Sequence, residues 1–239
     1  MRNPDENGWV SSSAAWLDRM PERGDFAREF ILDTPMMDRV KKSGAATMLD
    51  VGCGDGRFCR MAERLGIITT GIDPVEDFLH YARQTDPCGR YLTGFAEDLP
   101  FGDAEFDLVV FYLTLIDIND VRAAIREAAR VTKPKGTILV ANLTSFYTSN
   151  GTTGWVEGAD GREYHPLGNY LEERADWVEW DGLRIRNWHR PLCVYMSAFL
   201  DAGLQLTFYD EPAPSGGPQE RISRYHMTPF TMMMEWRRC

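Results

Sequence analysis

The chain has 239 residues, 44% of them hydrophobic, so it is long enough to bury one full core. Its formal net charge of -10 disfavours a general nucleic-acid binder, because phosphate contacts need clustered Lys and Arg. No apolar run reaches 18 residues and the N-terminus lacks a signal-peptide pattern, so we expect a cytoplasmic protein without a membrane segment.

The first segment, residues 1–43, is predicted to be helical. Residues 9–20 carry Trp9 and Trp16 among polar side chains, and residues 24–43 keep a mostly helical apolar period that Pro35 interrupts. Two tryptophans on such a helix suit either a flap over a flat ligand or an arm packed on the core. The residues alone leave both interpretations open.

Residues 46–73 carry the strongest signal in the chain. An apolar run enters a turn in which alternate positions are glycine, so a ligand can approach the main chain closely. A helical stripe follows, and a second apolar run ends in Asp73. Nucleoside-binding βαβ units place a ribose-binding carboxylate about 20 residues after the glycines. Asp73 followed by Pro74 is also typical of a helix start, and the two roles are compatible.

The string LDVGCGDG at residues 49–56 closely resembles motif I of the class I S-adenosylmethionine-dependent methyltransferases. Its GxGxG spacing differs from the dinucleotide fingerprint, and Asp55 would repel a phosphate but could hold an ammonium group. The resemblance implies that the turn lies under the methionine part of S-adenosylmethionine and that the acid ending the second strand binds its ribose. The cofactor residues implied here are Asp50, Gly52, Cys53, Gly54, Asp55, Gly56, Asp73 and Pro74.

Cys53 is interpreted as a small packing residue of the turn and not as a nucleophile. The five cysteines form no CxxC pair and no metal-ligand spacing, so we expect reduced thiols and no metal.

A short third strand at residues 89–95 leads to the hexapeptide AEDLPF at residues 96–101. This hexapeptide resembles the segment after the third strand of ubiquinone/menaquinone-type small-molecule methyltransferases. Those relatives place an Asp before the Ala to hold the adenine amino group, whereas this chain has Phe95. The resemblance therefore implies an adenine site made by Ala96, Glu97 and Asp98, with Phe95 as an apolar face.

Residues 106–112 form an almost continuous apolar run, as expected for a central parallel strand buried on both faces. In the family, the residues just beyond this strand contact the methionine and the methyl group, which implies Tyr112, Leu113 and Thr114. Ile116 and Asp117 stand where relatives often carry a pair of histidines. A helix beginning at Asp120 and a fifth strand at residues 137–142 follow.

Residues 143–190 differ from the rest, because they are rich in aromatic side chains and glycine. Two alternating runs around Asp181-Gly182 predict a β-hairpin. An insertion at this edge of a parallel sheet would stand over the ligand crevice, so we expect it to bind the acceptor. The alternative is an aromatic mini-core that buries only itself. Substrate-binding candidates are Trp9, Trp16, Tyr147, Trp155, Trp188 and His189.

A hydroxyl acceptor of methyl transfer needs a base, whereas a phenolate or amine does not always need one. We expect His189 to point into the crevice as a candidate base, with His165 a weaker candidate. Tyr112 and Tyr147 are candidate orienting residues. The remaining chain predicts a helix at residues 193–202, strands at 204–209 and 227–236, and a loop at 212–217.

Together, the patterns and the resemblance predict an α/β, Rossmann-like class I methyltransferase fold. Its sheet would have seven mostly parallel strands with an antiparallel last strand, an N-terminal helical lid (1–43), and a cofactor-binding domain (44–239) with a hairpin insertion (143–190). The implied activity is methyl transfer from S-adenosylmethionine, yielding S-adenosylhomocysteine, to O, N or C of a small aromatic acceptor by a monomer or homodimer. The alternatives are an RNA or protein methyltransferase and a non-catalytic regulatory module that binds the same cofactor.

Overall fold

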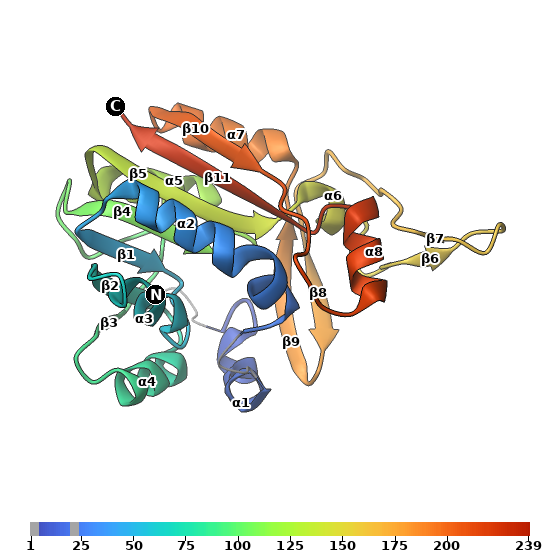
Figure 1. Ribbon diagram of the computed structural model, residues 1–239, viewed down its shortest axis with the longest axis horizontal. Helices are drawn as coiled ribbons and strands as arrows, with labels where there is room; N and C mark the ends of the chain where they lie inside the picture. Colours follow the sequence, from blue (N-terminus) through green and yellow to red (C-terminus); the bar gives the residue numbers. More distant parts are fainter. Residues whose placement is uncertain (1–4, 20–23) are drawn as a thin grey trace.

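A seven-stranded sheet runs through the computed structural model, which describes residues 5–19 and 24–239 (Figure 1). The strand order is β10-β11-β5-β4-β1-β2-β3, and β11 runs antiparallel to both of its neighbours while the pairs from β5 to β3 are parallel. The predicted class I methyltransferase fold is confirmed. The strands are β1 (Thr47–Val51), β2 (Ile68–Asp73), β3 (Arg90–Thr93), β4 (Phe106–Tyr112), β5 (Thr132–Leu143), β10 (Leu204–Asp210) and β11 (Thr231–Arg238).

Helices cover both faces of the sheet, which explains the almost continuous apolar run of β4. Val109 and Phe111 face the core under α5 (Val121–Val131) and α7 (Leu192–Asp201). Leu108 and Val110 face the opposite core, under α2 (Asp33–Ser43) and α3 (Arg57–Glu63). Successive side chains of a strand point to opposite faces, so a strand covered on both sides must be apolar throughout. Helix α4 (Glu76–Thr85) packs beside β2 and β3.

The predicted break near Pro35 takes the form of a wide turn. Residues Arg28–Leu32 form a π-helical segment, η1, in which the Asp33 amide donates to the Arg28 carbonyl. Pro35, in the first turn of α2, has no amide hydrogen and its ring would crowd the carbonyl four residues earlier. The widened turn relieves that crowding and leads directly into α2, so the helix continues through the proline.

The N-terminal helix α1 (Trp9–Arg19) packs against the insertion and against α4. Ser12 Oγ exchanges hydrogen bonds with the backbone of Arg184, and Ser13 Oγ donates to Asp77 at 2.7 Å. The division into a lid of residues 1–43 and a domain of residues 44–239 stays a prediction. Residues 1–4 and 20–23 of that segment lie outside the described residues.

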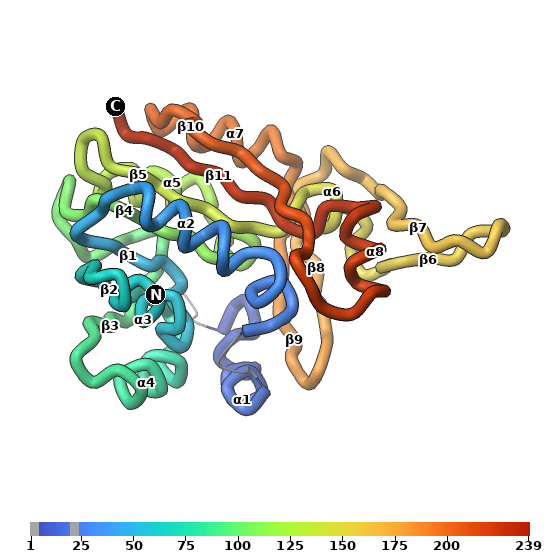
Figure 2. Tube along the Cα trace, viewed as in Figure 1, coloured from blue at the N-terminus to red at the C-terminus, as the bar shows by residue number. Residues whose placement is uncertain are grey.

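The insertion contains the predicted hairpin, formed by β8 (Arg174–Trp180) and β9 (Leu183–His189). Asp181 and Gly182 both have positive φ, 48° and 83°, as a type I′ turn requires. A second, shorter hairpin of β6 (Val156–Glu157) and β7 (Glu163–Tyr164) projects away from the body of the protein (Figure 2). Helix α6 (Ser145–Thr148) lies at the start of the insertion.

The C-terminal region differs from the prediction in one element. Residues 227–236 were expected to be a strand, but Met227 ends a helix, α8 (Gln219–Met227), and β11 begins at Thr231. Helix α8 has no buried residue and carries an ion pair between Glu220 and Arg224 at the i, i+4 spacing. Its weak apolar pattern explains why it was missed. No helix within the described ranges is long and apolar enough to cross a membrane.

Asp107 of β4 connects its own strand to β1 and β5 at the amino-terminal ends of these strands. The glycine turn lies at the opposite ends. Its carboxylate accepts from the Thr47 amide of β1 at 2.9 Å and from Lys133 Nζ of β5 at 2.8 Å. Burial would raise the pKa of Asp107, but hydrogen bonds from Lys133 and Thr47 outweigh it and hold the pKa at about 2.

We predict that Asp107→Asn lowers the free energy of unfolding at pH 7 by about 1–2 kcal/mol, after allowing for partial exposure of the pair. Because the folded-state pKa is lowered, this stability is present above the unfolded-state pKa and is lost as pH falls towards 2. Urea unfolding of wild type and variant at several pH values measures it. The control is Asp103→Asn, at a carboxylate that is 76% exposed. A difference that persists undiminished at low pH would contradict the prediction.

Candidate cofactor and acceptor site

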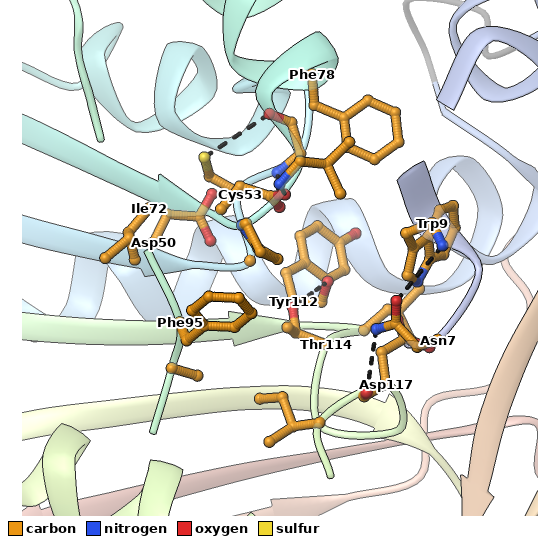
Figure 3. A pocket seen from close by; sticks show the side chains of 18 of the residues that line it. Asn7, Trp9, Asp50, Cys53, Ile72, Phe78, Phe95, Tyr112, Thr114 and Asp117 are labelled. Carbon is orange, nitrogen blue, oxygen red and sulfur yellow. Dashed lines mark hydrogen bonds between the residues drawn. The ribbon is translucent and has the colours of Figure 1, made fainter. Parts of the chain in front are cut away.

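A cavity of about 320 Å³ opens at the carboxyl ends of β1, β2 and β4 (Figure 3). This end of a parallel sheet is where ligands of such folds bind. The cavity brings together most of the predicted cofactor residues and both tryptophans of α1. The predicted residues that line it are Trp9, Trp16, Asp50, Gly52, Cys53, Gly54, Asp55, Asp73, Pro74, Ala96, Glu97, Tyr112, Leu113 and Thr114. Gly56, Asp98, Tyr147, Trp155, Trp188 and His189 are not among the lining residues.

The glycine turn depends on backbone conformations that side chains disfavour. Gly52 and Gly54 have φ values of 75° and 53°. A Cβ at Gly52 would overlap the side chain of Thr114, whereas a Cβ at Gly54 would meet nothing within 4 Å. Gly52 therefore allows the turn to pack directly on the residues that follow β4. Gly56 (φ 74°) precedes α3 and packs instead against Tyr91 of β3. A Cβ at Gly56 would lie 2.7 Å from the Tyr91 ring.

Asp73 connects this turn to the beginning of α4. Its buried carboxylate accepts hydrogen bonds from the Gly54 amide and from the Val75 amide, each at 2.9 Å. Burial raises the pKa of Asp73 to about 6, against the lowering effect of these two amides. Asp73 thus bonds to the residue before α4, although the N-cap itself is Val75 and not Asp73 as expected, and it also lies in the cavity wall.

Asp50 lies beneath the turn with one carboxylate oxygen, Oδ1, that is buried and has no hydrogen-bond partner within the described part of the chain. Burial raises the pKa of Asp50 to about 7. A buried polar atom without a partner is uncommon and requires an explanation, and Asp50 is one such residue that also lines the cavity. An ammonium group in the cavity would satisfy this oxygen.

The far end of the cavity suits a flat apolar ring with a polar edge. Ile72 and Phe95 line this end (Figure 3), followed by Ala96 and Glu97. Glu97 lies at the start of α5, where its Oε1 accepts from the Asp120 amide at 3.5 Å. With the acids at positions 50 and 73, these walls fit an amino acid, a ribose and an adenine joined in series.

Two arginines that the sequence analysis missed line the same cavity. Arg57 forms an ion pair with Asp33, and Tyr112 Oη donates to the same carboxylate at 2.7 Å. Arg28 lies over the Trp16 ring at 5.2 Å and over the Tyr112 ring at 5.6 Å. Burial raises the pKa of Tyr112 well above its ordinary value. Arg28 belongs to η1, whose helical pattern gave no sign of a ligand, whereas Arg57 directly follows the glycine turn and could have been identified there.

Tyr147 and Trp155 belong to an aromatic cluster away from the cavity. Tyr147 stacks on His165 at 4.8 Å and meets Phe230 edge-on at 4.5 Å, while Trp155 contacts the other side of His165 at 5.2 Å. Tyr225 stacks on Phe230 at 4.4 Å. This geometry matches the aromatic mini-core that was considered as the alternative for the insertion.

His189 does not point into the cavity, contrary to expectation. It is 1% exposed, its Nδ1 lies 2.8 Å from Thr148 Oγ1, and its Nε2 lies 2.9 Å from the Tyr170 carbonyl. Burial lowers its pKa. Both ring nitrogens are therefore engaged inside the insertion, by Thr148 of α6 and by the backbone of Tyr170. Its role as a base stays a prediction without geometric support.

The other residues of β9 hold the segment of residues 115–119 that follows β4, here called the acceptor loop. Asn187 Nδ2 donates to Asp117 Oδ1 at 2.7 Å, and the Trp188 amide donates to the Ile116 carbonyl at 2.6 Å. Trp188 Nε1 donates to Asn119 Oδ1 at 3.0 Å. The buried guanidinium of Arg190 donates to three loop carbonyls, those of residues 115, 118 and 119. The insertion thus acts on the cavity by fixing this loop.

Comparison with known proteins agrees with this geometry. Residues 49–140 match the family model described as a methyltransferase domain. A malonyl-[acyl-carrier protein] O-methyltransferase from Erwinia pyrifoliae is 30% identical over 164 residues, which cover 61% of this chain and 63% of that protein. A demethylmenaquinone methyltransferase from Tropheryma whipplei is 35% identical over 103 residues, 41% of each chain. An S-adenosylmethionine-dependent methyltransferase structure from Mesorhizobium loti shares 22% identity with a TM-score of 0.74, covering 99% of this chain and 100% of that one.

Residues 49–140 therefore match a methyltransferase domain, and the chain has the fold of the class I S-adenosylmethionine-dependent methyltransferases. The cofactor that these findings support is S-adenosylmethionine. The chain spans less than two thirds of the length of the Erwinia relative.

We predict that Gly52→Ala destabilises the protein by more than twice the cost of Gly44→Ala. Both glycines have positive φ, but a Cβ at Gly44 meets nothing within 4 Å, so that variant measures backbone strain alone, about 1 kcal/mol. At Gly52 the new methyl group must also displace Thr114. Urea unfolding compares the two variants, and equal losses would show that close packing at Gly52 is unimportant.

Proposed function

We propose that this protein catalyses methyl transfer from S-adenosylmethionine to O, N or C of a small, flat acceptor. The observation that carries the proposal is the unpartnered oxygen of Asp50 beside the glycine turn, in a cavity that continues past Tyr112 to Asp117 and Trp9. The polar groups that an amino acid requires thus lie between the side lined by Ile72 and Phe95 and the end at Asp117 and Trp9, where a second molecule would bind.

Each part of the cofactor has a matching set of residues. Asp50 would accept from its ammonium group, and Arg28 is the cation placed for its carboxylate, held by Asp25 and stacked on aromatic rings. Asp73 would accept from the ribose hydroxyls, with the adenine between Ile72 and Phe95. When bound, the cofactor supplies an electrophilic methyl group on a sulfonium.

The protein's own contribution is then placement and exclusion of water. Trp9 packs edge-on against Trp16 at 5.1 Å and against Phe78 of α4 at 5.9 Å. These rings cover the cavity between α1 and α4 and offer flat apolar surfaces to an acceptor. We propose that α1 acts as a lid over both ligands.

The names of the relatives support a small or carrier-linked acceptor. The Erwinia protein is named for methylation of a malonyl group on an acyl carrier protein, and the Tropheryma protein for methylation of demethylmenaquinone. The net charge of -10 continues to disfavour an RNA acceptor.

The experiment is titration of S-adenosylmethionine and S-adenosylhomocysteine into the protein by calorimetry, followed by an acceptor screen in which mass spectrometry detects one added methyl group. We expect binding of one cofactor per chain and turnover of at least one acceptor. Absence of cofactor binding would overturn the proposal. Tight binding with no turnover across the screen would favour the regulatory module instead.

We predict that Asp73→Ala weakens S-adenosylmethionine binding by about 100-fold, because it removes two charge-assisted hydrogen bonds to the ribose and releases the turn at Gly54. Calorimetry measures the affinity, and circular dichroism verifies the fold. The matched control is Glu76→Ala, which removes a mostly exposed carboxylate of α4 outside the cavity. Unchanged affinity in Asp73→Ala would remove the ribose role.

A further inference from the structure

We propose that the acceptor is an amine, and that Asp117 binds its amino group and receives the proton that methylation releases. This assignment rests on the proposed function and names the acceptor class of the same site. Neither the names of the Erwinia and Tropheryma relatives nor the resemblance in the sequence indicates it.

Asp117 occupies the end of the cavity opposite the adenine side. It lies with Asn7 and Trp9 at one end of the view in Figure 3, whereas Ile72 and Phe95 lie at the other. Its amide donates to the Thr114 carbonyl at 2.9 Å, so the loop folds back and directs this carboxyl group into the cavity. A second ligand beyond the methionine part of the cofactor would meet Asp117 and the Trp9 ring.

The position of this carboxylate is fixed by groups outside its own loop. Asn187 of β9 donates to Oδ1 at 2.7 Å, and Asn7 Nδ2 donates to the Asp117 carbonyl at 3.3 Å. The guanidinium of Arg190 holds the surrounding carbonyls. A reactive group held by such supporting bonds is preorganised for its task. Asn187 is accordingly a positioning residue.

The charges that line the cavity favour a cationic or neutral acceptor over an anionic one. The acids lining it are Glu6, Asp50, Asp55, Asp73, Glu97, Asp117 and Asp120, and the basic residues are Arg28 and Arg57. Both arginines are ion-paired, with Asp25 and Asp33 respectively. A carboxylate acceptor would therefore enter a negative field, whereas this field does not oppose a neutral amine.

Asp117 is also suited to proton transfer near neutral pH. Burial raises its pKa to about 7, although hydrogen bonds from Trp9 and Asn187 lower it. The nearby charge of Asp73 raises the same pKa and that of Arg28 lowers it. A base with a pKa near the working pH is the most effective at accepting a proton in catalysis.

Atoms, electrons and charges balance in the proposed methyl transfer, with Asp117 as the proton acceptor. The neutral acceptor nitrogen uses its lone pair to form the new N–C bond, while the methyl–sulfur bond breaks and its electron pair remains on sulfur. The methylated nitrogen then carries one positive charge and one proton more than the neutral product. That proton passes to the Asp117 carboxylate and leaves to solvent when the products are released.

The experiment uses a panel of aromatic amines, each paired with the alcohol and the carboxylate of the same carbon skeleton. Calorimetry measures their binding to the protein loaded with S-adenosylhomocysteine. We expect amines to bind at least tenfold more tightly than the paired carboxylates. In Asp117→Asn the preference for amines should disappear. The affinity for S-adenosylhomocysteine should change by less than twofold. The kcat for the best amine should fall by about 100-fold.

The pH profile provides a second readout. The ionised form of Asp117 is the one that accepts the proton. In the wild type, kcat/KM should therefore rise as pH increases through about 7. The charged groups that act on Asp117 are Asp73 of β2 and Arg28 of η1, and Glu6 lines the same cavity. Arg186 of β9 bonds to Glu6 and to Asn119 of the loop. Asp73 and Asp50 also titrate in this range. If the increase of kcat/KM with pH is lost in Asp117→Asn and kept in the charge-matched control Asp103→Asn, the increase is due to Asp117.

Two results would overturn the acceptor assignment. One is tighter binding or faster methylation of the paired carboxylates or alcohols. The other is Asp117→Asn protein that keeps the amine preference and the wild-type rate. Failure of the wild type to bind S-adenosylhomocysteine would instead count against the proposed function. Amine-selective binding without methylation would support the amine site and count against catalysis.

Discussion

The carboxylate of Asp73 is the interaction on which the arrangement of the site depends. It lies at the end of β2, almost fully buried, and satisfies the amide of Gly54 in the glycine turn and the amide of Val75 at the start of α4. A buried carboxylate is stable only when hydrogen-bonded, so Asp73 fixes the position of the glycine turn relative to the start of α4. The same residue lines the cavity, so the ribose-binding role proposed for it would share one carboxylate with this structural role.

The features that the sequence predicted well are those encoded by local chemistry. The glycines at positions 52, 54 and 56 all have positive φ, Asp181-Gly182 forms the expected tight turn, and Asp120 caps α5 by accepting from the Ala123 amide. The apolar run of β4 indicated a strand covered on both faces, as found. Each of these depends on residues adjacent in the chain, so their spacing alone is informative.

The features that were missed depend on contacts between distant residues. Nothing near Arg28 or Asp33 indicates that a wide helical turn brings them to Tyr112, 79 residues beyond Asp33. His189 was expected in the cavity because it follows the hairpin, but it bonds to Thr148 and to the Tyr170 carbonyl within the insertion, while Asn187, two residues earlier in β9, reaches the acceptor loop. The hairpin itself was predictable, whereas the surface on which its side chains pack was not.

The packing of Gly52 on Thr114 has a consequence for how this site can diverge. Because a Cβ at position 52 would overlap the side chain of Thr114, a larger residue at 52 requires a smaller one at 114. Substitutions at these two positions are expected to be tolerated only as compensating pairs, so the energetic effects of the two single changes would not add. Evolution towards new acceptors would therefore alter α1 and β9 more easily than this junction.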